Sequence, residues 1–303
     1  MASYQVSLSS AQRSTYLCQV SLSSISAKLA RLARGDLLRA VGHLSTNTIS
    51  WTKDCDATLL RHMRYLKGSR RFHQVGVIGD DFKDLQLCLY TDADVAGDRS
   101  DLKSTSGVFL ALVGTNSFWP LCGQSKKQTA VSHSTVEADL VACVHGLRSE
   151  GLPPLLLWEP ILGRKTSLVL YQDNQATMRI IQTGKTPTLR HIRRVHQVCV
   201  AWLHERVKSD DIDLKDCATD AMAADILINM FINGDKWLQV SHLVCVVTKS
   251  VARQLRPAPA APAVSPVAAA VHIPRAPALT AAAVGLPPSS VRVFTKGIED
   301  WGI

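Results

Sequence analysis

The chain has 303 residues, of which 46% are hydrophobic and 19% charged, a composition typical of a globular protein with one large or two ordinary domains. The net charge of +9 fits a polyanionic partner, although basic charge alone is weak support for nucleic-acid binding. No apolar run reaches 18 residues, and no basic flank precedes a continuous apolar core. These absences argue against a membrane span and a secretory signal.

The first 25 residues are rich in serine and contain "QVSLSS" twice, at Gln5–Ser10 and Gln19–Ser24. Two copies of six residues do not make a repeat architecture, so we expect a disordered leader over residues 1–25. From residue 26 to 80, apolar residues recur at helical spacing in "LLRAVGHL" and "ATLLRHMRYLKG". This segment predicts two or three helices, and the later helix has a basic face.

Residues 81–245 predict a mixed α/β domain. "DLQLCLYTD" alternates between apolar and polar residues and predicts a strand that ends at Asp92, and "TSGVFLALVG" and "NSFWPLCG" predict two further strands in a meander. The remaining elements follow in the order helix, strand, helix, helix, strand, helix. Their sequences are "STVEADLVACVHGLRS", "SLVLY", "NQATMRIIQ", "LRHIRRVHQVCVAWLHERV", "DIDLKDC" and "DAMAADILINMF".

The C-terminal segment changes composition to alanine and proline after about Arg253. Eight of the 13 prolines lie between Pro257 and Pro288. Such a segment buries too little apolar surface to offset its ordering entropy. We therefore expect residues 246–303 to form a disordered, low-complexity tail.

The cysteines carry no metal-binding or redox signature. They lie at positions 18, 55, 88, 122, 143, 199, 217 and 245, without a C-x-x-C pair or a Cys/His cluster at zinc-ligand spacing. Several fall within apolar runs. Reduced, buried thiols in an intracellular protein are the expected state.

Three aspartates in "LYTDADVAGDRS" invite a test for a calcium-binding loop. An EF-hand loop that starts at Asp92 requires an oxygen ligand at its fifth position and a glutamate at its twelfth. Ala96 and Lys103 occupy those positions, so the calcium loop is excluded. Asp92 ends a strand, whereas Asp94 and Asp98 are expected to shape the turn that follows it.

Four acids occupy positions at which a sheet and its helices can bring them together. Asp92 and Asp173 end predicted strands, Glu137 opens a helix, and Asp225 lies early in the last predicted helix. Each has a structural alternative. Ser134 and Glu137 fit a helix-capping box, Asp173 fits the N-cap of the next helix, and Asp225 fits an ordinary surface acid.

Four clustered carboxylates cannot all stay ionised without a counter-ion. Two divalent metal ions about 4 Å apart would supply it and would support phosphodiester cleavage. An all-oxygen site favours Mg²⁺, with Mn²⁺ as the alternative. In a basic protein, this set of residues predicts a metal-dependent nuclease.

Five motifs occur in a fixed order between Leu85 and Phe231: "YTDADVAGDRSDLKSTSGVFLALVG", "SKKQTAVSHSTVEADLVA", "LYQDNQATM", "LRHIRRVH" and "ADIL". Together they resemble the ribonuclease H domain that ends the Pol polyprotein of copia-type retrotransposons. The stretch from Gly35 to Ser69 resembles the end of the reverse transcriptase region that precedes that domain. The polymerase's paired catalytic aspartates are absent, so the chain looks like a C-terminal fragment of such a polyprotein.

The resemblance implies a ribonuclease H-like mixed sheet, with three antiparallel strands followed by parallel strands and flanking helices. It implies hydrolysis of the RNA strand of RNA/DNA hybrids with two Mg²⁺ ions, leaving 5′-phosphate and 3′-hydroxyl ends. The implied partners are the hybrid and the other parts of the polyprotein, without a membrane. The implied location is a cytoplasmic particle or the nucleus, and the oligomeric state is left open.

Two groups of residues receive roles from the resemblance. The implied catalytic and metal-binding residues are Asp92, Glu137, Asp173 and Asp225. The implied substrate-binding residues are Lys126, Lys127, Asn174, Gln175, Arg190 and His191. For the basic members of this second group, a solvated structural role is the alternative.

The sequence departs from the family pattern at several positions. Val95 replaces the tryptophan after DAD, "ADILIN" loses the lysine of ADILTK, and no histidine occurs in "CATDAMAAD" before the final acid. These departures favour a second hypothesis, a catalytically decayed nucleic-acid-binding remnant. A DNA nuclease or transposase on the same scaffold is a third, disfavoured because the motifs match the ribonuclease branch across the domain.

Overall fold

The computed structural model describes residues 29–31, 33–48, 50–97, 101–186, 188–231, 233–254 and 292–297. The predicted leader, residues 1–25, lies outside these ranges. Within the described ranges, no helix combines the length and apolar character that crossing a membrane requires. The seven cysteines in these ranges are all free thiols, and five of them are buried.

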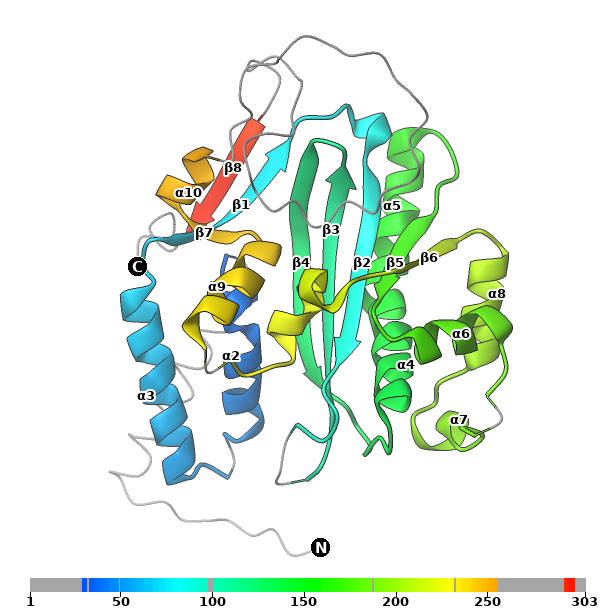
Figure 1. Cartoon of the computed structure of the whole chain (residues 1–303), viewed down its shortest axis with the longest axis horizontal. Coiled ribbons are helices and arrows are strands. Elements are labelled where there is room, and N and C mark those ends of the chain that lie inside the picture. The colour runs from blue at the N-terminus through cyan, green and yellow to red at the C-terminus, as the bar shows by residue number, and fades with distance from the viewer. Residues whose placement is uncertain are drawn as a thin grey trace, which may run out of the picture.

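A mixed sheet forms the centre of the fold (Figure 1). Strands β2 (Gln86–Ala93), β3 (Thr105–Gly114) and β4 (Ser117–Lys127) pair antiparallel, as a meander. Strands β5 (Leu168–Gln172) and β6 (Ile212–Asp216) add in parallel on the other side of β2. The resulting order, β6-β5-β2-β3-β4, is that of a ribonuclease H-like sheet and confirms the predicted fold class.

Three strands that the sequence did not reveal extend the sheet beyond β4. Strand β1 (Phe72–Ile78) pairs antiparallel with β4, β7 (Val246–Thr248) and β8 (Arg292–Gly297). The sheet therefore begins inside the segment predicted to be only helical, residues 26–80. Residues 246–254 and 292–297, which were predicted to be disordered, form β7, α10 and β8: Val246 and Val247 are buried in the core, and β8 pairs with the open edge of β1.

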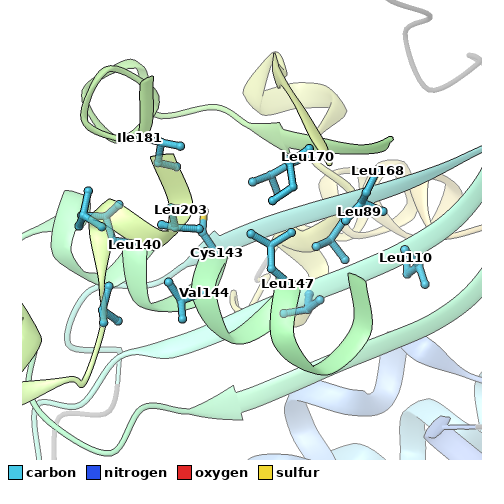
Figure 2. Close-up of a cluster of buried hydrophobic side chains, with 14 of the residues drawn as sticks. Leu89, Leu110, Leu140, Cys143, Val144, Leu147, Leu168, Leu170, Ile181 and Leu203 are labelled. Atoms are coloured by element: carbon cyan, nitrogen blue, oxygen red, sulfur yellow. The ribbon is translucent and has the colours of Figure 1, made fainter. Parts of the chain in front are cut away.

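One face of the sheet is covered by α4 (Thr135–Gly146), α5 (Leu152–Leu162), α6 (Gln175–Thr183), α7 (Ile192–Val195) and α8 (Val200–Lys208). Apolar side chains of β2, β3 and β5 that point to this face meet Leu140, Cys143 and Val144 of α4 in the main core (Figure 2). Gly146 of α4 lies so close to β2 that an added Cβ would stand 2.9 Å from Thr91 Cγ2. Helix α4 therefore packs directly against β2, without room for a side chain at position 146.

The opposite face is covered by α9 (Gly234–Leu243), α2 (Leu38–Thr46) and a 3₁₀ turn over Ala223–Leu227. The alternate residues of β2 point here, among them Cys88 and Tyr90. Helix α3 (Lys53–Gly68) packs beside α2 through Tyr65 and Leu66. A short helix, α10 (Lys249–Gln254), follows β7.

Several predicted helices differ in extent. The helix expected over residues 189–207 is divided into α7 and α8, because Gln197 has a positive φ of 57° that redirects the chain. The last predicted helix, over 220–231, forms only short 3₁₀ turns at Thr219–Ala221 and Ala223–Leu227. Helices α5 and α9 were not predicted.

A buried polar network joins the N-terminal helices to the rest of the fold. The guanidinium of Arg34 donates to both carboxylate oxygens of Asp36, at 2.9 and 2.7 Å, and both side chains are fully buried. Tyr65 of α3 donates its hydroxyl hydrogen to Asp36 over 2.7 Å, and Trp237 of α9 donates to the Tyr65 oxygen over 3.0 Å. Helix α3 and Asp36 are thus joined to α9 through Tyr65 and Trp237.

Removal of one partner from this network should destabilise the whole chain. Asp36→Ala leaves the Arg34 guanidinium buried without a counter-charge, and we expect the free energy of unfolding to fall by about 3–5 kcal/mol in urea titrations. Asp81→Ala removes an exposed carboxylate without a capping bond and should change it by about 0.5 kcal/mol or less. Equal effects of the two substitutions would contradict this account.

Candidate active site

Asp92 and Asp173 lie side by side at the same end of the sheet. In the parallel pair β2–β5, Cys88 stands opposite Val169 and Tyr90 opposite Tyr171. Continuation of this register places Asp92 opposite Asp173, on strands that are about 4.8 Å apart. The structure therefore brings these two predicted residues together.

Asp139, on α4, is the third member of the cluster, and the sequence reasoning missed it. Its carboxylate accepts hydrogen bonds from the Asn174 side-chain amide at 2.8 Å and from the Thr177 hydroxyl at 3.4 Å. The side-chain oxygen of Asn174 also accepts from the backbone N–H groups of Ala176 and Thr177, so Asn174 caps α6. The residue that follows Asp173 thus holds Asp139 towards the strand ends.

Asp225 reaches the cluster from the 3₁₀ turn on the other face of the sheet. The turn lies directly over Gly107, which stands opposite Asp92 in β3. An added Cβ on Gly107 would be 2.7 Å from Ile228 Cγ2 and 2.8 Å from the carbonyl oxygen of Ala224. Glycine at position 107 therefore permits the approach that brings Asp225 close to Asp92.

The raised pKa values of Asp92 and Asp139 reflect burial and repulsion by neighbouring carboxylates. The pKa of Asp92 is raised to about 8 by burial and by the negative charges of Asp173, Asp139 and Asp225. Burial likewise raises the pKa of Asp139 to about 7, against the hydrogen bond from Asn174. The charge of Asp173 raises the pKa of Asp92, Asp139 and Asp225, so the four carboxylates form one electrostatic cluster.

The pKa of Asp225 is also raised, mainly by burial. A hydrogen bond from the Asn229 side chain and the positive charge of Lys236 oppose this shift. Lys236 lies on α9, beyond the "ADIL" motif that lost its own lysine. Lys236 therefore places a positive charge near Asp225, although the lysine of the family's ADILTK motif is absent.

Glu137 does not join this cluster. It is fully buried, accepts a hydrogen bond from the His133 backbone N–H at 2.9 Å, and lies 3.1 Å from Nε2 of both His191 and His196. Residues two apart on a helix point to nearly opposite sides, which is why Asp139 faces the strand ends and Glu137 does not. The expectation that Glu137 joins the other three acids is corrected accordingly.

The predicted capping box is present. Ser134 accepts a hydrogen bond from the backbone N–H of Glu137 at 3.2 Å, as the structural alternative for these residues predicted. Asp94 likewise shapes the turn after β2, because its carboxylate accepts from the Thr105 backbone N–H. Asp98 lies outside the described residues.

The remaining predicted residues divide between the neighbourhood of the acids and the surface. Lys126 and Lys127 end β4, and Lys127 is 2.9 Å from the carboxylate of Asp101. Gln175 donates to Asp216, the last residue of β6, which pairs with Gln172 of β5. Arg190 is exposed, and His191 contacts Glu137. Of the predicted substrate-binding residues, Asn174 is the one that bonds directly to the cluster.

The donor set suits a hard divalent cation. All four side chains are carboxylates, and the clustered negative charge lies at a partly buried position where a cation would be attracted. As the side chains are placed, no group of three or more His, Cys, Asp or Glu residues within the described ranges is ready to hold a metal ion.

Comparisons with known proteins show where the chain has relatives. No family model matches it. It is 29% identical over 199 residues to the "Retrovirus-related Pol polyprotein from transposon TNT 1-94" of Nicotiana tabacum, over 64% of this chain and 14% of the relative. It is 35% identical over 106 residues to the transposon RE1 polyprotein of Arabidopsis thaliana, over 35% of this chain and 7% of the relative.

The chain is similar to plant retrotransposon Pol polyproteins. This confirms the resemblance read from the motifs. The chain spans about a seventh of the tobacco relative and less of the others. Activities and partners of the whole polyproteins are therefore matters for proposal.

Solved structures resemble the chain with low TM-scores, and two serve as examples. One is LC11-RNase H1 in complex with an RNA/DNA hybrid, at 18% identity and a TM-score of 0.35, over 50% of this chain and 99% of that one. The other is a foamy viral protease-reverse transcriptase in complex with an RNA/DNA hybrid, at 10% identity and a TM-score of 0.36. The match covers 70% of this chain and 27% of that one. The fold assignment rests on the strand order and directions described above.

The close approach over Gly107 can be tested by adding one methyl group. We expect Gly107→Ala to lower the free energy of unfolding by about 1–3 kcal/mol, because the turn that carries Asp225 must move outward. Gly234→Ala, at a position with no atom within 4 Å of the added Cβ, should have a much smaller effect in the same urea titration. A neutral Gly107→Ala would refute the tight packing.

Proposed function

We propose that the chain is a metal-dependent endonuclease that hydrolyses the RNA strand of RNA/DNA hybrids. The observation that carries this proposal is the convergence of Asp92, Asp139, Asp173 and Asp225 where β2 and β5 end. Similarity to retrotransposon Pol polyproteins supports the choice of substrate. Asp139 takes the role that the sequence reading gave to Glu137.

The four aspartates would hold two Mg²⁺ ions, with Mn²⁺ as a substitute, because carboxylates on separate elements offer oxygen ligands from several directions. Such an ion pair, when bound, activates water and stabilises the leaving oxygen of a phosphodiester. The protein's own part is to orient the ligands. Asn174 fixes Asp139, the Thr219 hydroxyl donates to Asp173 over 3.1 Å, and Asn229 fixes Asp225.

A basic surface on α3 supports a polyanionic partner. Five exposed cations follow one another along this helix and the turn after it: Arg61, Arg64, Lys67, Arg70 and Arg71. No carboxylate in the described part of the chain forms an ion pair with any of them. We propose that this α3 surface contacts the phosphate backbone of the hybrid.

Cleavage of a labelled hybrid by the full chain tests the proposed activity. We expect Mg²⁺-dependent cleavage of the RNA strand that EDTA abolishes, with products that carry 5′-phosphate and 3′-hydroxyl ends. Asp92→Asn should reduce the rate by at least about 100-fold, because it removes one carboxylate from the cluster. Hybrid binding with no cleavage above that of Asp92→Asn would instead support the non-catalytic remnant.

The choice between Asp139 and Glu137 gives a second test. Asp139→Asn should weaken Mn²⁺ binding, measured by calorimetry without substrate, by about 10-fold to 100-fold, because it removes a negative oxygen ligand. Glu137→Gln should leave Mn²⁺ affinity within about threefold but lower the free energy of unfolding by about 1–3 kcal/mol, because Glu137 is buried among histidines. The opposite ranking would restore Glu137 as the ligand.

The α3 surface can be tested through the salt dependence of hybrid binding. The triple variant Arg61→Gln/Arg64→Gln/Lys67→Gln should lower the slope of log K against log[salt] by roughly 2–3, since each phosphate contact contributes about 0.9. Lys83→Gln/Arg179→Gln/Lys208→Gln carries the same charge change on exposed residues outside α3. Equal slopes for the two variants would exclude a specific α3 contact.

A further inference from the structure

Arg39 of α2 bridges two segments that each carry one of the clustered acids. Its Nε donates to the carbonyl oxygen of Ile228 over 2.8 Å, and one terminal nitrogen lies 3.5 Å from Asp94 Oδ2. Ile228 comes three residues after Asp225, and Asp94 comes two residues after Asp92. Arg39 itself belongs to the N-terminal helical segment, far from both in sequence.

The Asp94 end of the bridge is fixed to the sheet. The Asp94 backbone N–H donates to the Thr105 carbonyl at 3.2 Å, and the Asp94 carboxylate accepts from the Thr105 N–H. Gly97 packs against this carboxylate so closely that an added Cβ would clash with Asp94 Oδ2. A displacement of the Asp94 side chain would therefore also displace the end of β2.

The Ile228 end is fixed to the turn that carries Asp225. The backbone N–H of Ile228 lies 3.3 Å from the Asp225 carbonyl oxygen, and the N–H of Asn229 donates to the same oxygen at 3.1 Å. Within the described residues this turn is not part of the sheet, and it rests on β3 over Gly107. The position of this turn along the sheet therefore depends on contacts with neighbouring elements, and Arg39 of α2 provides one of them.

We infer that Arg39 is a positioning residue that sets the spacing between Asp92 and Asp225. The inference rests on the proposed function for its kinetic consequences. A planar guanidinium can serve two acceptors at a fixed angle, which the flexible, single ammonium of lysine does less well. The side chain is only 12% exposed, so it acts within the fold and does not face solvent freely. The N-terminal helices thereby complete the candidate active site.

The experiment compares Arg39→Gln and Arg39→Lys with Arg31→Gln, an exposed arginine of the same N-terminal segment. Mn²⁺ affinity is measured by electron paramagnetic resonance without substrate, and kcat and KM on a labelled hybrid. Amide hydrogen exchange is followed over residues 93–97 and 223–229. All measurements use the full chain.

We expect Arg39→Gln to weaken Mn²⁺ binding and lower kcat by about 10-fold to 100-fold, with KM within about twofold, as for loss of a residue that supports metal ligands. Exchange should rise in both segments together, and Arg39→Lys should recover part of each effect. Arg31→Gln should match the wild type in all three measurements.

Three results would overturn the inference. The first is that amide exchange in both segments of Arg39→Gln is unchanged. The second is that Arg39→Gln raises KM and leaves kcat unchanged, which would indicate a direct contact with the nucleic acid. The third is that Arg31→Gln loses as much Mn²⁺ affinity and kcat as Arg39→Gln does. If the wild type binds Mn²⁺ without cleaving the hybrid, the proposed function fails while affinity and exchange still decide the role of Arg39. If the wild type also binds no Mn²⁺, amide hydrogen exchange alone decides whether Arg39 positions the two segments.

Discussion

Repulsion among four aspartates, at the point where β2, β5, α4 and the 223–227 turn meet, is the constraint on which the surrounding structure depends. Within the described residues, none of the four forms an ion pair. Neutral donors hold them instead: the backbone N–H of Ala93 for Asp92, and side chains of Asn174, Thr219 and Asn229 for the others. Neutral donors orient a carboxylate without cancelling its charge, so the cluster keeps its attraction for cations.

The N-terminal helices are a structural part of this arrangement. Arg34 and Asp36 anchor them through Tyr65 to Trp237 of α9, and the same face of the sheet carries the turn with Asp225. The boundary expected near residue 80 therefore divides one packed unit. A polar network of this kind tolerates little change, because every buried donor and acceptor needs its partner.

Strands β2, β3 and β5 were predictable because the alternation in β2 and the apolar runs of β3 and β5 are strong local signals, whereas their arrangement in the sheet was implied by the resemblance to the ribonuclease H domain. The choice between Glu137 and Asp139 was not, since both are acids in one turn and the Ser134 cap made Glu137 prominent. The break comes at Gln197, whose positive φ of 57° its residue type does not signal, next to His196, whose side chain is buried against Glu137. The pairing of β1 with β7 and β8 depends on backbone bonds between distant segments, which side-chain patterns do not encode.

That last pairing has a consequence for the order of folding. His73 of β1 stands opposite Gly297 of β8, a separation of 224 residues along the chain, whereas β2, β3 and β4 pair through short turns. Long-range pairing forms late, because a large loop must close before any contact rewards it. Strands β2 and β5, whose ends place Asp92 and Asp173, are therefore expected to assemble before β8 pairs along the outer edge of β1.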